Sequence, residues 1–397
     1  MKNNIVFRDY QDEAVDKAVW ALDKFDNNSL VVAPTGSGKS LIVAGIADRL
    51  RREILILQPS KEILAQNKEK LALYVPEEEI GVYSASFNRK DIKKYTFATI
   101  QSIYKKPELF NHIGAVLVDE CHAVNPRNSA GMFTSFLHAI GKPQMIGLTA
   151  SPYRLDTYYS RTQLGDTIST TCLKLINRMN PRMWNRIVFN INNKELVENK
   201  YLAPLDYHPR TCIPHLKIPL NKNNTDFDLD AYTQLLTPFE TQIIDSIAKA
   251  TQHRKAVLIF CSSLAQAERM SSALIGSAWV SGATSNKERD RIIQEFKDGK
   301  IKAVFNVGVL TTGFDFPALD CIYMLRPTRS LALYYQMLGR GTRIADGKDD
   351  CTVVDYTGNY ESLGKVEDIR LEKGEKLWEL YANGEPQHNK PLYSWAI

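Results

Sequence analysis

The stretch "LVVAPTGSGKSLI", Leu30–Ile42, passes from an apolar run to small residues, a lysine and a serine. Its centre, Ala33–Ser40, matches the phosphate-loop pattern, with alanine where the commonest form has glycine. A strand-like run precedes it and a helical run follows. Gly36 and Gly38 let backbone N–H groups converge on one point, where the following helix directs the positive end of its dipole. This context predicts a phosphate site in an α/β fold and weakens the alternative, a glycine-rich turn.

Two further pairs of residues extend this site. Lys39 is expected to bind the β and γ phosphates, and Ser40 to offer its hydroxyl to Mg²⁺. Further along, "AVLVDECH" puts Asp119 and Glu120 at the end of an apolar strand, where open parallel sheets place their ligands. Asp119 can bind Mg²⁺, and Glu120 can accept a proton from the attacking water. An isolated Asp-Glu pair is more often a solvated strand end, but with a phosphate loop it predicts a nucleoside triphosphatase.

Length and composition set the broad class. A chain of 397 residues exceeds the roughly 250 to 300 residues of a single core, so two or more domains are expected. Hydrophobic content of 44% and charged content of 24% are typical of globular proteins. Neither a membrane span nor a secretory signal is recognisable, which favours a cytoplasmic location. The six cysteines form no C-x-x-C pair, so no zinc is expected, and the net charge of +5 weakly indicates a polyanionic partner.

Short β-branched runs alternate with helical patterns in two stretches, which predicts parallel α/β units. The first stretch has the runs "SLVVA", "EILIL", "TFATI", "AVLVD" and "MIGLT". The second has "AVLIF", "AVFNV", "CIYML" and "TVVDY". In the second stretch, "SNKERDRIIQEFKDG" predicts a helix capped by Ser285 and ended before Gly299. The end of the chain, "KLWELYANGEPQHNKPLYSWAI", predicts one helix and a strap.

Arginines in the second half can complete a triphosphatase site. In "YYQMLGRGTRI", Arg340 and Arg343 are three residues apart and would project from one face of a helix, with Gln336 a turn earlier. Such a pair can reach a γ-phosphate held by another domain and stabilise transition-state charge. The alternative is an ordinary basic helix face.

A loop before these arginines is a candidate for phosphate contacts. In "NVGVLTTGFDFPALD", Thr311, Thr312 and Gly313 form a turn suited to a backbone phosphate. Asp315 is expected to contact a nucleotide ribose or a domain boundary.

The region 152–207 mixes basic residues with aromatic ones, a composition that suits single-stranded or junction nucleic acid. The alternative is that the rings belong to a core. The aromatic residues are Tyr153, Tyr158, Tyr159, Trp184 and Tyr201.

Nine segments resemble, in order, the motifs of superfamily 2 helicases. They are "FRDYQDEA", "APTGSGKS", "LQPSKEILAQN", "FATIQSI", "VDECH", "GLTASPYR", "LIFCSS", "NVGVLTTGFDFP" and "QMLGRGTR". Within that superfamily the chain is similar to the DExH-type branch, and most of all to RadD-type DNA repair helicases and related phage branched-DNA helicases. RadD-type chains continue into a cysteine-rich zinc-binding tail, whereas this sequence has no C-x-x-C pair.

The resemblance implies two tandem RecA-like domains, with parallel sheets flanked by helices and an ATP site in the cleft between them. The implied layout is a first RecA-like domain at 1–152, an insert and linker at 153–237, a second RecA-like domain at 238–360, and a C-terminal helix and strap at 361–397. It also implies an ATP-dependent DNA helicase or translocase for forked or branched DNA, acting as a monomer with no membrane partner. An RNA helicase and a nucleotide-gated clamp that does not unwind remain alternatives.

The resemblance further assigns roles to single residues. Arg8 and Gln11 would recognise adenine, and Thr149 and Ser151 would couple hydrolysis to domain movement. Gln336, Arg340 and Arg343 would complete the catalytic site with Lys39, Asp119 and Glu120. The expected ATP-binding residues of the loop are Pro34, Thr35, Gly36, Ser37, Gly38, Lys39 and Ser40. The expected contacts to the nucleic-acid backbone, each with a turn or cap role as its alternative, are Pro59, Ser60, Thr99, Gln101, Ser262, Ser281, Gly282 and Thr311.

Overall fold

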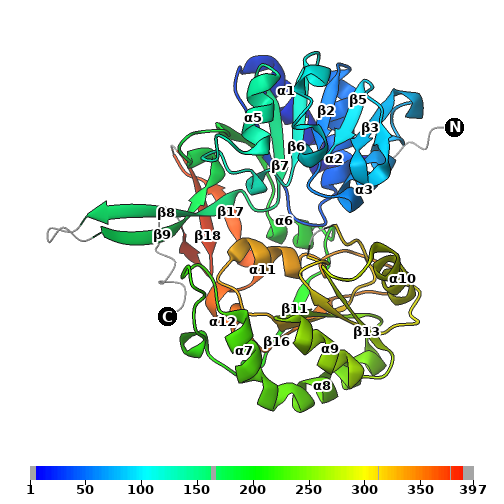
Figure 1. The fold of residues 1–397 in the computed structure, drawn as a ribbon, viewed down its shortest axis with the longest axis vertical. Coiled ribbons are helices and arrows are strands. Elements are labelled where there is room, and N and C mark those ends of the chain that lie inside the picture. Colours follow the sequence, from blue (N-terminus) through cyan, green and yellow to red (C-terminus); the bar gives the residue numbers. More distant parts are fainter. Residues whose placement is uncertain (1–5, 162–166, 312, 376, 388–397) are drawn as a thin grey trace. The chain divides into compact units, whose positions relative to one another are not determined.

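The computed structural model describes residues 6–161, 167–311, 313–375 and 377–387. The chain divides into two compact units (Figure 1). The first comprises Met1–Arg154 and Lys174–Ile191, and the second comprises Leu155–Leu173 and Asn192–Ile397. Within the described ranges, no helix combines the length and the apolar character needed to cross a membrane.

An eight-stranded sheet forms the centre of the first unit, in the order β10-β1-β7-β6-β2-β5-β3-β4. Its strands are β1 (Ser29–Val32), β2 (Ile54–Leu57), β3 (Ile80–Ser84), β4 (Arg89–Lys90), β5 (Tyr95–Ala98), β6 (Ala115–Asp119), β7 (Met145–Thr149) and β10 (Arg186–Asn190). Every pairing is parallel except the short antiparallel pair β3–β4. The inner strands are buried along their whole length, which explains why they read as unbroken apolar runs.

Helix α1 (Asp9–Lys24) precedes β1. The helices in the connections between the strands are α2 (Lys39–Leu50), α3 (Lys61–Leu71), α4 (Ile100–Ile103) and α5 (Met132–Ala139). Helix α1 buries an alanine-rich face and contacts β1, β7 and β10. In α2, a Cβ atom on Gly45 would lie 2.8 Å from side-chain atoms of Phe7 and Val15. The glycine therefore permits the close approach of α1 to the helix that begins at the phosphate loop.

A six-stranded parallel sheet forms the centre of the second unit, in the order β11-β16-β15-β12-β14-β13. Its strands are β11 (Leu205–Pro209), β12 (Val257–Cys261), β13 (Ser277–Ser281), β14 (Ala303–Val307), β15 (Cys321–Leu325) and β16 (Cys351–Asp355). The helices are α6 (Asn193–Glu198), α7 (Leu229–Leu236), α8 (Glu240–His253), α9 (Leu264–Ser272), α10 (Asn286–Lys297), α11 (Leu331–Leu338) and α12 (Asn359–Leu363). Tyr232, Ile243 and Ile247 belong to the same buried cluster as the strand residues Val257 and Ile259.

All nine predicted runs form strands of the two sheets, namely β1, β2, β5, β6 and β7 in the first and β12, β14, β15 and β16 in the second. The predicted helix is α10, and its start follows the expected chemistry, because Ser285 Oγ accepts a hydrogen bond from the Glu288 N–H. The segment expected as an insert behaves differently. It supplies β10 to the edge of the first sheet and β11 to the edge of the second.

The C-terminal region differs from the expected helix and strap. Beyond α12, the strands β17 (Arg370–Lys373), β18 (Trp378–Ala382) and β19 (Glu385–Pro386) form an antiparallel sheet. Leu371 pairs with Leu380 across this sheet, and both are buried. Asn383 and Gly384 make the turn into β19 with φ values of 51° and 75°. Positive φ at both positions is what Asn-Gly hairpin turns provide, so the turn chemistry overrides the helical spacing of "KLWELY". Residues 388–397 of the expected strap lie outside the described ranges.

Two strands remain. β8 (Tyr153–Arg161) and β9 (Thr167–Leu175) form a two-stranded sheet of their own.

Candidate active site

The phosphate loop connects β1 to α2 in a conformation that its glycines permit. Gly36 has φ 86° and Gly38 has φ 81°, values that side chains rarely adopt. A Cβ atom on Gly38 would lie 2.4 Å from Gln11 Nε2, so a side chain there would displace the amide that donates to the Ser37 carbonyl. Ser37 Oγ donates to the Pro34 carbonyl at 2.7 Å and holds the turn closed. The loop is thus a preformed cradle at the start of a helix, the geometry that binds phosphate.

Two side chains at the start of α1 form hydrogen bonds with this loop. Tyr10 Oη and Gln11 Nε2 both donate to the Ser37 carbonyl, at 2.6 and 2.9 Å. Gln11 Oε1 accepts from the Arg8 N–H at 3.1 Å, so both ends of this amide are bonded within the chain. The residue expected to recognise adenine is therefore also a support of the phosphate loop. Tyr10 had no role in the sequence analysis, although it lies in the quoted motif "FRDYQDEA".

Lys39 lies over the loop that it follows. Its Nζ donates to the carbonyls of Ala33 and Pro34, at 3.3 and 3.1 Å. Ser40 is the next residue in the first turn of α2 and is half-buried, as Lys39 is. Thr35 is almost wholly buried in the loop. The structure thus places the Lys39 amine against the carbonyls of the loop, with Ser40 next to it in the first turn of α2.

Asp119 lies at the C-terminal end of β6 and is almost wholly buried. Its Oδ1 accepts from the Glu120 N–H at 2.9 Å, and its Oδ2 accepts from Asn67 Nδ2 at 3.0 Å. Burial raises the pKa of Asp119 to about 6, with Glu120 adding to the rise and Lys39 opposing it. Burial therefore works against ionisation of this carboxylate, and the positive charge of Lys39 favours it. Asn67, on α3, was missed as a partner because only the folded chain brings it to β6.

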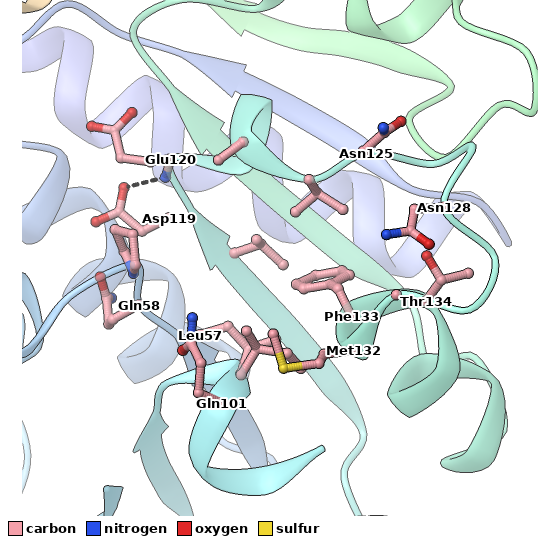
Figure 2. Close-up of a pocket in the computed structure, with 16 residues that line it drawn as sticks. Leu57, Gln58, Gln101, Asp119, Glu120, Asn125, Asn128, Met132, Phe133 and Thr134 are labelled. Atoms are coloured by element: carbon pink, nitrogen blue, oxygen red, sulfur yellow. Dashed lines mark hydrogen bonds between the residues drawn. The ribbon is translucent and has the colours of Figure 1, made fainter. Parts of the chain in front are cut away.

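Glu120 follows directly in a left-handed backbone conformation, with φ 48° and ψ 43°. A non-glycine residue in this region costs on the order of 1 to 3 kcal/mol, and such conformations cluster at functional sites. Figure 2 shows the Glu120 side chain leaving the end of β6 beside Asp119, with the dashed hydrogen bond between them. Glu120 Oε2 lies 3.4 Å from His122 Nδ1. The conformation aims a second carboxylate out of the sheet edge.

His122 links this carboxylate to the end of β7. Its Nδ1 lies 2.8 Å from Thr149 Oγ1 and 3.3 Å from Ser151 Oγ. The Ser151 N–H in turn donates to Thr149 Oγ1 at 3.0 Å. Burial lowers the pKa of His122, which favours the neutral ring. Thr149 and Ser151, which are expected to couple hydrolysis to domain movement, therefore both contact His122, and His122 in turn lies beside Glu120. No role was predicted for His122 from the sequence.

The two arginines of the second unit do not lie on a helix, contrary to expectation. Helix α11 ends at Leu338, and Arg340 and Arg343 lie in the turn that follows. Gly339 and Gly341 explain this end, because glycine is a poor helix former and favours C-termini.

Both arginines nevertheless converge on one point. Arg340 Nη1 and Arg343 Nη1 donate to the Phe314 carbonyl, at 2.8 and 3.1 Å. Arg343 also forms an ion pair with Asp315, so this carboxylate, expected at a ribose or domain boundary, is bonded to an arginine. Arg340 Nε donates to the Gln336 carbonyl at 3.3 Å.

Candidate backbone contacts of the first unit lie near the ends of β2 and β5. Pro59 and Gln101 are exposed. Ser60 caps α3, its Oγ accepting from the Ile63 N–H at 3.4 Å. Thr99 Oγ1 lies 2.9 Å from Ser102 Oγ. The two hydroxyls thus already serve the cap and turn roles that were their alternatives, whereas Pro59 and Gln101 can be contacted from solvent.

Candidate contacts of the second unit are mostly buried. Ser262 Oγ donates to the Leu325 carbonyl at 2.6 Å, and Ser281 Oγ accepts from the Ala283 N–H at 3.2 Å. Thr311 is largely buried, and Gly282 is exposed. Thr312 lies outside the described residues, and Gly313 has φ 72°. Ser262 is therefore committed to the core, which favours its structural alternative.

Aromatic residues of the region 152–207 divide in a similar way. Tyr153 and Trp184 are buried in the core of the first unit, and a Cβ atom on Gly147 would lie 2.8 Å from the Trp184 ring. For these two, the core alternative is correct. Tyr201 is half-buried, and the side chains of Tyr158 and Tyr159 lie outside the described part of the chain.

No group of three or more His, Cys, Asp and Glu side chains is arranged to hold a metal ion within the described ranges. A nucleotide-bound Mg²⁺ does not need one, because it usually takes one or two protein ligands in addition to phosphate oxygens and water. The buried carboxylate of Asp119, with the Ser40 hydroxyl as the second expected ligand, fits this kind of site.

Two family models match the chain. The model described as "Type III restriction enzyme, res subunit" matches residues 4–154, and "Helicase conserved C-terminal domain" matches residues 240–345. The first match spans the phosphate loop, Asp119, Glu120 and Thr149. The second contains Arg340 and Arg343.

Curated relatives share about a quarter of their residues with the chain. "Putative ATP-dependent helicase IRC3" of Saccharomyces cerevisiae is 25% identical over 91% of this chain and 52% of its own length. "Putative helicase 22" of a Sulfolobus islandicus filamentous virus is 26% identical over 90% of this chain and 65% of its own length. "DNA 3'-5' translocase XPB2" of Sulfurisphaera tokodaii is 23% identical over 87% of this chain and 80% of its own length. The chain thus spans between about half and two thirds of the length of the first two relatives.

Solved structures share the fold at lower identity. "ATP-dependent Type ISP restriction-modification enzyme LlaBIII bound to DNA" superposes with a TM-score of 0.64 at 16% identity, covering 89% of this chain and 28% of the other. "S. cerevisiae Dbp5 bound to RNA and ADP BeF3" superposes with a TM-score of 0.54 at 15% identity, covering 88% of this chain and 83% of the other. With its two family matches, its helicase-named relatives and its two sheet-centred units, the chain belongs to the superfamily 2 helicases and has two tandem RecA-like domains.

Proposed function

We propose that this chain is a DNA-stimulated ATPase that translocates along DNA and separates strands at forks or branches. The observation that carries the proposal is the presence of three groups in the first unit: the Lys39 amine against the phosphate loop, the buried carboxylate of Asp119 at the end of β6, and Glu120 directly after it in a left-handed conformation. An amine, a metal carboxylate and a second carboxylate are the groups that phosphoryl transfer to water requires.

Each residue has a part in this reaction. Backbone N–H groups of the loop, with Lys39, would bind the phosphates of ATP, while Arg8 and Gln11 would contact adenine. Ser40 and Asp119 would hold Mg²⁺, which neutralises charge on the β and γ phosphates when bound. Glu120, whose Oε2 lies 3.4 Å from His122 Nδ1, would accept the proton of the attacking water.

The second RecA-like domain would complete the site. We infer that ATP binds in the cleft between the domains, where Arg340 and Arg343, with Gln336, stabilise the transition state. Contacts made only in the closed state favour that state, so loss of the γ-phosphate would reopen the cleft. The contact of His122 with Thr149 and Ser151 would transmit the change from Glu120. In this proposal the first RecA-like domain ends near residue 152, the insert and linker near residue 237, and the second RecA-like domain near residue 360.

DNA is the proposed substrate because relatives of the chain are named DNA translocases and DNA helicases. A role on branched DNA, as in RadD-type helicases, and a monomer acting in the cytoplasm of a bacterium or of a phage host complete the proposal. Exposed Pro59 and Gln101 would contact the strand backbone from the first unit, with Ser60 and Thr99. Ser281, Gly282 and Thr311 would do so from the second.

The test measures ATP hydrolysis with and without forked DNA, together with displacement of the labelled strand. Wild type should hydrolyse ATP faster with DNA and release the strand, whereas Lys39→Ala should do neither. Lys17→Ala is the matched control, because Lys17 is an exposed lysine on α1 whose ion pair is with Glu13 of the same helix. Stimulated hydrolysis by Lys39→Ala at the wild-type rate would contradict the site, and a stronger response to a matched RNA fork would favour an RNA helicase.

A further inference from the structure

A cavity of about 360 Å³ lies beside Glu120 in the first unit, at the C-terminal ends of β2 and β6 (Figure 2). Gln58, Asp119 and Glu120 lie on one side of it in this view, and Asn125 and Asn128 lie on the other, with Phe133 between them. Ligand cavities span roughly 300 to 1,000 Å³, so this one suits a single ring system rather than an extended chain.

Gln58 is the unusual member of the lining. Its backbone is fixed by a hydrogen bond from its N–H to the Ala98 carbonyl at 2.9 Å. Its side chain is only 3% exposed, yet neither Oε1 nor Nε2 has a hydrogen-bond partner among the described residues. Buried amides are nearly always bonded, and one left without partners lowers stability. An unsatisfied donor and acceptor on one rigid amide therefore indicate a ligand with a matching acceptor and donor side by side.

The charges around the cavity decide what kind of ligand fits. None of the described residues that line it is a lysine or an arginine, whereas two are the carboxylates of Asp119 and Glu120. An anion such as phosphate is therefore repelled. A neutral planar group with hydrogen-bonding edges is favoured, because the Phe133 ring offers it an apolar surface and Gln58 offers it a paired donor and acceptor.

The cavity opens where the strand is expected to pass. Pro59 and Gln101, both proposed contacts of the strand backbone, belong to its lining and are exposed to solvent. A phosphodiester that contacts these two residues would stay outside the acidic cavity, while its own base could reach in. A nucleobase matches the groups that line the cavity. Glutamine forms paired hydrogen bonds with the edge of a base, and aromatic rings stack on its face.

We propose that this cavity binds one unstacked nucleobase of the bound strand, with Gln58 pairing to the base edge and Phe133 contacting its face. The inference rests on the proposed function, because the strand must bind for its base to enter. It adds a base-binding site to contacts that otherwise involve only the backbone, and it places that base next to Glu120. A strand without bases would then bind more weakly although its phosphates are unchanged.

The test compares the affinity of the full chain for a short single strand of mixed sequence and for an abasic strand of the same length. Gln58→Met keeps the volume of the side chain and removes its amide, and Phe133→Leu removes the ring. The matched control is Gln294→Met on the exposed face of α10, where the amide donates to Asp298. Thermal unfolding of each variant shows whether it is folded as the wild type is.

Wild type should prefer the strand with bases by roughly 5- to 100-fold, the range that stacking of one base provides. Gln58→Met and Phe133→Leu should each reduce this ratio at least fivefold and leave affinity for the abasic strand unchanged, while Gln294→Met should alter neither. An equal ratio in all four proteins would overturn the base site and leave the proposed function standing. Absence of binding to either strand by wild type would instead contradict the proposed function.

A free nucleobase could have the same chemistry, and a further arm separates the two sources. Deoxyadenosine is titrated into wild type and Gln58→Met without any strand. If wild type binds deoxyadenosine more weakly than the strand, and Gln58→Met does not bind it, the result supports delivery of the base by the strand. Tight binding of deoxyadenosine, combined with equal affinity for the two strands, would assign the cavity to a free ligand and overturn the proposal.

Discussion

Thr149→Val removes one oxygen from the junction between the ends of β6 and β7 and changes little else. Valine has nearly the shape of threonine, and position 149 is fully buried. Thr149 Oγ1 accepts from the Ser151 N–H at 3.0 Å and lies 2.8 Å from His122 Nδ1. The substitution therefore leaves the buried Ser151 N–H without its acceptor and removes the shorter of the two hydroxyl contacts that position the His122 ring.

The magnitude follows from these two losses. An orphaned buried N–H costs about 1 to 3 kcal/mol, and an ordinary hydrogen bond contributes about 0.5 to 1.5 kcal/mol. His122 Nδ1 keeps the contact with Ser151 Oγ at 3.3 Å, which limits the second loss. The free energy of unfolding of the first unit should therefore fall by about 2 to 4 kcal/mol. Thr149→Ser, which keeps the oxygen, should lose less than half as much.

The assay combines denaturant unfolding, monitored by tryptophan fluorescence, with ATP hydrolysis and strand displacement. We expect Thr149→Val to retain more of its hydrolysis than of its displacement, because the contact from His122 to Thr149 is lost while Lys39 and Asp119 are untouched. Displacement per ATP equal to wild type, or unfolding within about 0.5 kcal/mol of wild type, would refute the reasoning; that bound is the ordinary scatter of neutral substitutions.

Three further substitutions test other parts of the structure. Gly38→Ala puts a methyl group where φ is 81° and 2.4 Å from Gln11 Nε2, and should weaken ATP binding at least tenfold in a fluorescent-nucleotide titration; unchanged affinity would contradict the cradle. Arg343→Lys cannot bond both Asp315 and the Phe314 carbonyl as the guanidinium does, and should lower DNA-stimulated hydrolysis by about 10³-fold while DNA binding measured by anisotropy persists. Burial lowers the pKa of His215 to about 4, whereas the histidine of the unfolded chain has a pKa of about 6.5. As the pH drops from about 6.5 to 4, the unfolded chain binds a proton that the folded chain does not. The free energy of unfolding of the second unit should therefore fall by up to about 3 kcal/mol over this range. The fall should be smaller in His215→Gln, and equal slopes in the two proteins would show that the histidine is not responsible.

Local sequence patterns predict the strands well because of how parallel sheets are built. Inner strands such as β6 and β12 are buried on both faces and read as continuous apolar runs, so each is recognisable by itself. The edge strand β10 alternates buried and half-buried residues, and β11 is mostly exposed, which made both look like parts of an insert. In the C-terminal sheet, the Asn383-Gly384 pair was a readable turn signal that the spacing of apolar residues obscured.

The candidate site shows the same division. The phosphate loop and the Asp119-Glu120 pair are contiguous in sequence, so their chemistry can be read directly. Asn67 and Tyr10 contact these groups only because α3 and α1 pack against the sheet, which no short pattern specifies. Arg340 and Arg343 meet at the Phe314 carbonyl rather than on one helix face, because Gly339 and Gly341 favour an end of α11 at Leu338.

Glu120→Gln tests the central claim most directly, because it removes the proton acceptor and leaves every other proposed ligand of ATP and Mg²⁺ in place. Nucleotide binding, ATP hydrolysis and strand displacement should all be measured for this variant on the same forked DNA. The account predicts ATP binding within about twofold of wild type, hydrolysis reduced by about 10² to 10⁴-fold, and displacement abolished. Hydrolysis and displacement at wild-type rates would contradict it.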